Sequence, residues 1–436
     1  MILEYETLEY DAMDRIKISG GISLKGKVRT QGAKNAALPV MASCLLLKGQ
    51  KMVLNNVPNL QDVETMTELL TVLGVSVTRE ADNNNTVFRV PETVSWEAPE
   101  SLVRKMRASS LVLGPLLARC GRAVLPLPGG CSIGSRPIDL HLKGLVQMGA
   151  KIEIKNGFVY AQAERLRGRR IYLDFPSVGA TENLMMAAVF AKGETIIENT
   201  AREPEIENLA AVLRGMGVQV DTEGVGCIRV QGVSEVHGCS ERVIPDRIEA
   251  CTYLLAGVMT GGEVTVEDVI PEHVDALLAK LEEAGVSFSV EKNSIAVHPV
   301  NKLQPISLKT MPFPGFPTDL QPQMVAALTL SNGVSLVEES VFQARFLYSA
   351  ELNRMGANID IKGDTAIIKG VKNLSGASVK ASDLRAGAAL ILAGLAAEGE
   401  TRVENIEHVL RGYEAIDLKL RALGADVAFE TDAQRS

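Results

Sequence analysis

The sequence has few of the residues that most often indicate a metal site or a disulfide-stabilised protein. Of its 436 residues only 4% are aromatic, and it contains one tryptophan, five histidines and six cysteines. No two cysteines have the CxxC spacing typical of zinc sites, so we predict no metal site. A disulfide framework is not expected in a chain of this length. The scarcity of aromatics predicts cores built from aliphatic side chains, with most of the thiols, Cys44 in particular, buried among them.

Long hydrophobic runs and an excess of basic residues are also missing. No apolar run reaches the ~18 residues of a membrane span. The first twenty residues carry acidic groups and lack the apolar core of a secretory signal. The formal net charge of -8 at pH 7 disfavours nucleic acid and anionic membranes as general partners. We therefore expect a cytoplasmic protein, with no nucleic-acid or membrane partner, that holds any anionic ligand with a local group of cations.

What the sequence does contain is an internal repeat. A helical segment that ends in glycine and leads into a strand recurs six times, for example as LLTVLGVSV and VLRGMGVQV. A glycine just past a helix end can adopt the left-handed conformation and turn the chain into a strand. The marker glycines, about 70 residues apart, are Gly74, Gly149, Gly217, Gly285, Gly356 and Gly424.

Each repeat contains two helices of different character. The first, as in ENLMMAAVFAKG, is apolar on nearly every face, which indicates burial all round. The second, as in HVDALLAKLEEAG, is amphipathic with a period of 3.6 residues. A fully buried helix needs sheets packed around it, so we expect an α/β fold in which strands surround helices.

The two ends of the chain differ from the repeats. The last repeat closes with one strand where the others have two, and a surplus strand, RIKISGG, precedes the first repeat. If the start of the chain pairs with the last repeat, one lobe comprises residues 1–34 plus 245–436 and the other residues 35–244. Because ligands tend to bind in clefts between lobes, we expect the functional site there.

Polar residues open several of the helices predicted to be buried, as in GAKN, SVGATEN and SDLRAGA. Helix N-termini present free N–H groups and a partial positive charge, so a group of them would bind an anion. Serine, aspartate and asparagine at these positions are also explained as simple caps. The cations Lys34, Arg107 and Arg385 are disfavoured by the helix dipole, and they indicate either an intervening anion or exposed surface charge.

The segment PLPGGCSIGSRP, residues 126–137, is too rich in glycine and proline to be a helix or a central strand. It places Cys131 on a loop before a helix that we expect to begin at Pro137, with Asp139 in its first turn. Arg136 and the helix dipole would lower the pKa of the Cys131 thiol. The glycines would let the loop close over a ligand. An ordinary exposed loop cysteine is the alternative.

These segments resemble the UDP-N-acetylglucosamine 1-carboxyvinyltransferase family of enolpyruvyl transferases. The resemblance covers nearly the whole chain after about residue 15. It is carried by GAKNAALP, LPGGCSIGSRPIDLHL, SVGATEN, AREPEI, FPTDLQPQ, DLRAGAAL and RGYE. It implies a two-domain, inside-out α/β barrel of six βαβαββ repeats, as in EPSP synthase. It also implies that the enolpyruvyl group of phosphoenolpyruvate moves to the 3′-hydroxyl of UDP-N-acetylglucosamine with release of phosphate, the first committed step of peptidoglycan synthesis, without a metal or cofactor.

The resemblance also implies roles for individual residues. Cys131 would protonate the enol methylene and can form a covalent adduct, and Asp319 would take the proton of the sugar hydroxyl. The donor's phosphate would be bound by Lys34, Arg136 and Arg411, its carboxylate by Arg345 and Arg385, and the intermediate would touch Asn35. The sugar nucleotide would be bound by Arg107, Arg136, Pro137, Ile138, Asp139, Leu140, Ser177, Val178, Asp319 and Val341.

Two alternatives stay open at this point. The sister enzyme 3-phosphoshikimate 1-carboxyvinyltransferase has the same fold and donor, but would be expected to have a GSKS-like segment in place of GAKN and no cysteine loop. A non-catalytic scaffold of six repeats would have no reason to hold Cys131, Asp319 and five cations together.

Overall fold

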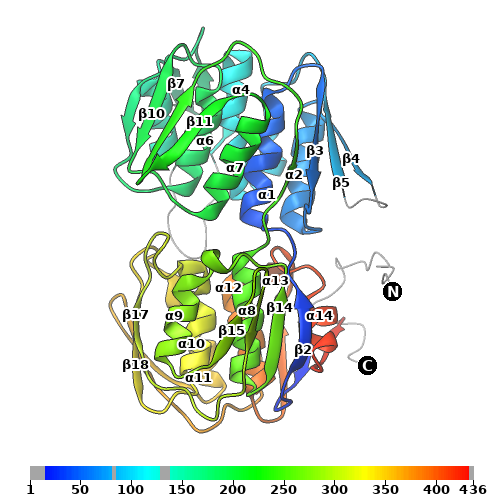
Figure 1. Ribbon diagram of the computed structural model, residues 1–436, viewed down its shortest axis with the longest axis vertical. Coiled ribbons are helices and arrows are strands. Elements are labelled where there is room, and N and C mark those ends of the chain that lie inside the picture. Colours follow the sequence, from blue (N-terminus) through cyan, green and yellow to red (C-terminus); the bar gives the residue numbers. More distant parts are fainter. Residues whose placement is uncertain (1–14, 81–84, 128–137, 432–436) are drawn as a thin grey trace. The chain divides into compact units, whose positions relative to one another are not determined.

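The computed structural model describes residues 15–80, 85–127 and 138–431. The contacts within this part of the chain divide it into two compact units, each described here by itself (Figure 1). Unit 1 contains residues 15–30 and 246–431, and unit 2 contains the described residues between 31 and 245.

Unit 2 has three sheets. The first has the strand order β13(Ser240–Arg242), β3(Gln50–Asn55), β5(Asn85–Val90), β4(Ser76–Glu80). The second has the order β6(Arg122–Pro126), β8(Phe158–Gln162), β7(Lys151–Lys155). The third has the order β11(Gln219–Gly224), β12(Cys227–Gln231), β10(Glu194–Glu198), β9(Arg170–Tyr172). Its helices are α1(Lys34–Ser43), α2(Gln61–Val72), α3(Glu100–Val103), α4(Leu113–Cys120), α5(Asp139–Gln147), α6(Val178–Ala188) and α7(Pro204–Gly215), with 3₁₀ turns η2(Cys44–Leu46) and η3(Arg107–Val112).

Unit 1 repeats this plan. Its first sheet has the order β15(Phe288–Val290), β16(Ser294–Val297), β14(Glu263–Glu267), β2(Lys25–Arg29). Its second has the order β17(Ser307–Lys309), β18(Val334–Glu338), β20(Thr365–Lys369), β19(Asn358–Lys362). Its third has the order β21(Ser378–Lys380), β22(Glu400–Glu404), β1(Arg15–Ser19), β23(Asp426–Glu430). Its helices are α8(Arg247–Met259), α9(Asp275–Glu283), α10(Gln321–Leu328), α11(Ser349–Arg354), α12(Leu384–Ala396), α13(Glu407–Leu410) and α14(Ile416–Ala422), with 3₁₀ turns η4(Pro271–His273), η5(Thr318–Leu320) and η6(Arg345–Tyr348).

The sheets are variants of one design. In most of them an antiparallel group of strands gains one parallel neighbour, for example β17 beside β18 and β21 beside β22. The third sheet of unit 1 takes β1 from the start of the chain, which pairs antiparallel with both β22 and β23. This is the strand that the last repeat lacks in sequence. The predicted fold class, an α/β fold of repeated units, is confirmed.

The six marker glycines follow helix ends in the left-handed region. Their φ angles lie between 83° and 106°, a range that a residue with a side chain rarely adopts. Each glycine therefore turns the chain from the amphipathic helix of its repeat into the following strand, as the sequence predicts.

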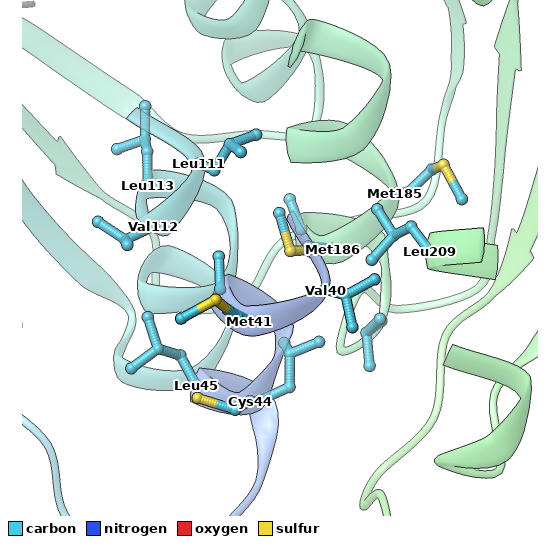
Figure 2. Packing of buried hydrophobic residues seen from close by; sticks show 14 of the residues in the cluster. Val40, Met41, Cys44, Leu45, Leu111, Val112, Leu113, Met185, Met186 and Leu209 are labelled. Atoms are coloured by element: carbon cyan, nitrogen blue, oxygen red, sulfur yellow. The ribbon is translucent and has the colours of Figure 1, made fainter. Parts of the chain in front are cut away.

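Both cores are built around nearly apolar helices. All thirteen residues of α8 and all eight of α10 are buried, and α8, α10 and α12 pack against one another in unit 1. Figure 2 shows aliphatic and methionine side chains packed in unit 2, with Cys44 among them. The prediction for Cys44 is confirmed, and Cys251 is also buried, but Cys120, Cys227 and Cys239 are only partly buried. The prediction that most of the thiols are buried is therefore wrong for the described cysteines. None of the helices in the described part of the chain combines the length and the hydrophobicity needed to cross a bilayer.

Candidate active site

In unit 2 the predicted residues lie at the ends of helices. Lys34 is the first residue of α1, where no side chain caps the helix, and the exposed Asn35 follows it. The Nζ of Lys34 donates to Oδ2 of Asp62 at 3.0 Å, and both side chains are largely buried (12% and 7% exposed). A protein carboxylate from the first turn of α2 therefore offsets a cation that the α1 dipole disfavours. Sequence reasoning missed Asp62, which local pattern presents only as a residue of an amphipathic helix.

Two of the predicted sugar-nucleotide segments, residues 138–140 and 177–178, lie at the starts of α5 and α6, two helices that pack against each other. Ser177 caps α6, accepting a hydrogen bond from the backbone N–H of Ala180 at 3.3 Å, so the capping interpretation holds for this residue. Val178 follows it as the first residue of α6, and the α5 segment contributes Ile138, Asp139 and Leu140. Helix α5 begins at Asp139.

A buried imidazole joins these segments. His141 on α5 is 5% exposed, and its Nδ1 accepts from the side-chain amide of Asn183 at 2.9 Å. Burial and, to a smaller extent, the charge of Arg107 together lower the pKa of His141 to about 4. The ring is therefore neutral at pH 7, with its proton on Nε2. Asn183 also donates to the Ser110 carbonyl and accepts from Gly114 N–H. Because the charge of Arg107 acts on His141, Arg107, the first residue of η3, lies near the starts of α5 and α6.

In unit 1, Asp319 lies between two arginines. Nη2 of Arg345 donates to its Oδ1 at 3.2 Å, and Nη2 of Arg385 donates to its Oδ2 at 2.9 Å. The arginine side chains are 2% and 6% exposed, and that of Asp319 is 29% exposed. Three residues predicted from different segments of the sequence therefore form one cluster.

Arg385 lies in the first turn of α12, and neighbouring groups fix its position. Asp383 caps α12 by accepting from the backbone N–H of Arg385 and of Ala386. The guanidinium lies 5.9 Å from the centre of the Tyr413 ring, and the Tyr413 hydroxyl pairs with that of Thr252 at 2.9 Å. Burial lowers the pKa of Arg385, but the charges of Asp319, Tyr413 and Asp246 and the hydrogen bond to Asp319 together outweigh burial, and the net pKa lies above the ordinary value. Arg385 is therefore a permanent cation.

Arg411 lies two residues before Tyr413, whose ring contacts Arg385. It is the C-cap residue that follows α13, and it precedes Gly412. A Cβ at Gly412 would lie 2.6 Å from the Leu384 side chain, so the Arg411 segment packs against the start of α12. The structure thus brings the Arg411 segment to the same helix end as Arg385.

A buried carboxylate that sequence reasoning missed ties Val341 to the Asp319 turn. Glu339 is 4% exposed. Its Oε1 accepts from the N–H groups of Val341 (2.8 Å) and Phe342 (3.1 Å) and from the Thr310 hydroxyl (2.9 Å). Its Oε2 accepts from the Thr318 hydroxyl at 3.0 Å, next to Asp319. The sequence pattern predicts only that Glu339 lies at the end of an amphipathic strand.

Three predicted site residues, Cys131, Arg136 and Pro137, lie outside the described residues. Within the described ranges, no three histidine, cysteine, aspartate or glutamate side chains are grouped so that they could hold a metal ion. The described chemistry is therefore that of cations, carboxylates and helix ends, which suits an anionic substrate and acid–base catalysis.

Comparison with known proteins gives a consistent answer. The model of the EPSP synthase (3-phosphoshikimate 1-carboxyvinyltransferase) family matches residues 18–420. UDP-N-acetylglucosamine 1-carboxyvinyltransferase 2 of Carboxydothermus hydrogenoformans is 54% identical over 96% of this chain and 100% of its own length. UDP-N-acetylglucosamine 1-carboxyvinyltransferase 1 of Staphylococcus aureus is 50% identical over 95% and 99%.

Solved structures match the fold at lower identity. The enolpyruvyl transferase NikO from Streptomyces tendae has a TM-score of 0.87 at 24% identity, over 96% of this chain and 99% of that one. EPSP synthase from Acinetobacter baumannii has a TM-score of 0.74 at 20% identity, over 95% and 100%. The resemblance seen in the motifs is confirmed, and the chain belongs to the EPSP synthase family and, within it, to the UDP-N-acetylglucosamine 1-carboxyvinyltransferases.

Proposed function

We propose that the chain transfers the enolpyruvyl group of phosphoenolpyruvate to the 3′-hydroxyl of UDP-N-acetylglucosamine and releases phosphate, in the first committed step of peptidoglycan synthesis. The observation that carries this proposal is identity of 50% or more, over nearly the full length of both chains, with enzymes named for this reaction. The cluster of Asp319 with Arg345 and Arg385 supports it, because it supplies a carboxylate and two carboxylate-binding cations.

The proposed reaction is an addition followed by an elimination. In the addition, the Cys131 thiol gives a proton to C3 of phosphoenolpyruvate, the sugar oxygen bonds to C2, and Asp319 takes the hydroxyl proton. In the elimination, the Cys131 thiolate takes a proton back from C3, the bond between C2 and the phosphate oxygen breaks, and phosphate departs with the proton that Asp319 held. The product carries the enolpyruvyl ether, so atoms and charges balance without a redox step.

The proposed binding residues divide by charge. Lys34, Arg136 and Arg411 would hold the donor's phosphate, and Arg345 and Arg385 its carboxylate, with Asn35 at the intermediate. The sugar nucleotide would be bound at Arg107, at Arg136 to Leu140, at Ser177 and Val178, and at Asp319 and Val341. Guanidinium groups suit both anions because they donate two parallel hydrogen bonds.

The proposal includes the predicted lobes, residues 1–34 plus 245–436 and 35–244, as parts that act together on the substrates. Closure over the substrates would exclude water, so that the sugar captures the activated donor before hydrolysis. It also includes a cytoplasmic location and no nucleic-acid or membrane partner, as the charge and the sequence predict.

The test is phosphate release by the full-length chain with phosphoenolpyruvate and one acceptor at a time. We expect release with UDP-N-acetylglucosamine and none with shikimate 3-phosphate, and a product heavier by one enolpyruvyl group in the mass spectrum. Release with shikimate 3-phosphate alone would favour the sister activity. Release with neither acceptor would favour a non-catalytic scaffold.

A further inference from the structure

Asp319 is the most solvent-accessible member of the cluster that it forms with Arg345 and Arg385. Its side chain is 29% exposed, whereas those of the two arginines are 2% and 6% exposed. Each carboxylate oxygen accepts from a different arginine, at 3.2 and 2.9 Å. The two guanidinium groups thus form a buried fork for one carboxylate, and a side chain of the protein fills it.

The two arginines are fixed more firmly than the carboxylate. Arg385 is the second residue of the thirteen-residue helix α12 and lies against the Tyr413 ring. Arg345 donates to the Thr318 carbonyl at 3.1 Å and lies 5.7 Å from the centre of the Phe342 ring. Asp319, in contrast, sits in the three-residue turn η5. Of the three residues, Asp319 therefore has the most exposed side chain and lies in the shortest element.

The acids near the fork, apart from Asp319, have hydrogen bonds to backbone N–H groups, although the charge of Asp246 also acts on Arg385. Asp383 is occupied as the cap of α12, and Asp246 accepts from the N–H groups of Ile248 and Glu249 at the start of α8. Nε of Arg345 is buried and has no hydrogen-bond partner among the described residues. A carboxylate that fits the two guanidinium groups better than Asp319 does could bind to their positive charge and accept a hydrogen bond from Nε of Arg345.

The hydrogen bonds from Arg345 and Arg385 also conflict with the proposed role of Asp319 as the general base. A carboxylate that accepts charge-assisted hydrogen bonds from two guanidinium groups is a poor proton acceptor, because protonation weakens both bonds. The proposed donor, phosphoenolpyruvate, carries a carboxylate of its own. We propose that Asp319 occupies the place of the donor's carboxylate in the unliganded protein, and that donor binding displaces it and so releases it to act as the base. This inference rests on the proposed function.

The first test compares two ligands on one variant. Asp319→Asn keeps the shape of the side chain and removes its charge, so phosphoenolpyruvate no longer has to displace a charged competitor. By isothermal titration calorimetry on the full-length chain, we expect Kd for phosphoenolpyruvate to fall by about tenfold, or about 1.4 kcal/mol. Inorganic phosphate has no carboxylate, so its Kd should change by less than about threefold. Equal tightening of both ligands would indicate a general charge effect and overturn the inference, as would unchanged or weaker binding of phosphoenolpyruvate.

A matched control and a second measurement complete the test. Glu338→Gln removes an exposed carboxylate of the same unit, paired with Lys309, and should leave both affinities unchanged. If Asp319→Asn does not fold, infrared difference spectra of the wild-type chain labelled with ¹³C-aspartate give the answer. Phosphoenolpyruvate should shift a labelled carboxylate band and inorganic phosphate should not. An unshifted band would overturn the inference.

The two proposals fail in different ways. If the wild-type chain releases no phosphate with both substrates present, the proposed function fails, whatever the affinities. If it turns over but the two Kd values do not diverge in Asp319→Asn and the labelled band does not shift, only the displacement of Asp319 fails.

Discussion

Replacement of Glu339 tests how the structure holds the turn that carries Asp319. In Glu339→Ala, the N–H groups of Val341 and Phe342 and two threonine hydroxyls lose their acceptor. Each buried donor left unsatisfied costs about 1–3 kcal/mol, and the hydroxyls can rotate toward other acceptors. We therefore expect a loss of about 3–5 kcal/mol in the free energy of unfolding, measured by urea denaturation.

Glu339→Gln separates hydrogen bonding from charge. The amide oxygen can take the place of Oε1, which accepts three of the four bonds, while the amide nitrogen donates to the Thr318 hydroxyl. Only the added strength of the charged bonds is lost, about 1 kcal/mol. Glutamine should therefore restore most of the stability that alanine removes.

Kinetics distinguish a positioning role from a structural one. Glu339 connects the Asp319 turn to Val341, so Glu339→Ala should raise KM for UDP-N-acetylglucosamine and lower kcat by roughly tenfold, and Glu339→Gln should stay within roughly threefold of wild type. The control is Glu338→Ala on the same strand, whose exposed pair with Lys309 contributes about 0–1 kcal/mol. Equal effects of alanine and glutamine at Glu339, or an unchanged KM in the alanine variant, would refute the reasoning.

Three further predictions follow from other contacts. Asp62→Asn should destabilise the chain by about 1–3 kcal/mol in urea denaturation, because it removes the counter-charge of Lys34. It should also lower KM for phosphoenolpyruvate, because the donor's phosphate no longer has to displace a charged carboxylate from Lys34; an unchanged or higher KM would contradict this competition. The pKa of His141 is about 4 in the folded chain, against an ordinary 6.5, so between these values the unfolded chain binds a proton that the folded chain does not. The free energy of unfolding should therefore fall by up to about 3 kcal/mol as pH drops from 6.5 to 4. In urea denaturation, His141→Gln should flatten this part of the pH profile, and an equal slope in wild type and variant would refute the assignment. Intact-mass spectra should show that fosfomycin adds once to the wild-type chain, at Cys131, and does not add to Cys131→Ser. Burial raises the pKa of Cys44, Cys120, Cys239 and Cys251 and so keeps these thiols protonated and unreactive. A protein that stays unmodified and still turns over would refute the role of Cys131.

The sequence predicts those parts of the fold that depend on local pattern. The marker glycines, such as Gly74 and Gly424, identify the helix ends in the sequence, because only glycine adopts the required φ without strain. The buried helices, such as α8, are visible because apolar residues cover every face. The motif residues at the helix starts, such as Lys34 and Arg385, are visible because cations oppose the local dipole.

The partners of these residues could not be predicted, because tertiary packing alone decides them. Lys34 and Asp62 are 28 positions apart, and Arg385 and Asp319 are 66 positions apart. Asp62 and Glu339 lie in an amphipathic helix and at the end of an amphipathic strand, where an acidic residue is ordinary. Burial distinguishes them, and burial depends on which elements meet. For Lys34 the sequence left both an intervening anion and exposed surface charge open. In the described residues its side chain is largely buried and pairs with Asp62, a carboxylate of the protein itself.

The same arrangement occurs in both units and constrains how an acidic protein can bind anionic substrates. Lys34 in unit 2 is paired with Asp62, and Arg345 and Arg385 in unit 1 are paired with Asp319. A buried cation without a counter-charge would cost several kcal/mol in the unliganded fold, so each needs a partner before substrate arrives. If these cations bind the donor as proposed, its phosphate and carboxylate must compete with these partners, which would lower affinity but tie binding to the release of a protein carboxylate. Where that carboxylate is Asp319, the proposed exchange would both admit the donor and free the base, so the chemistry would start only when the donor is in place.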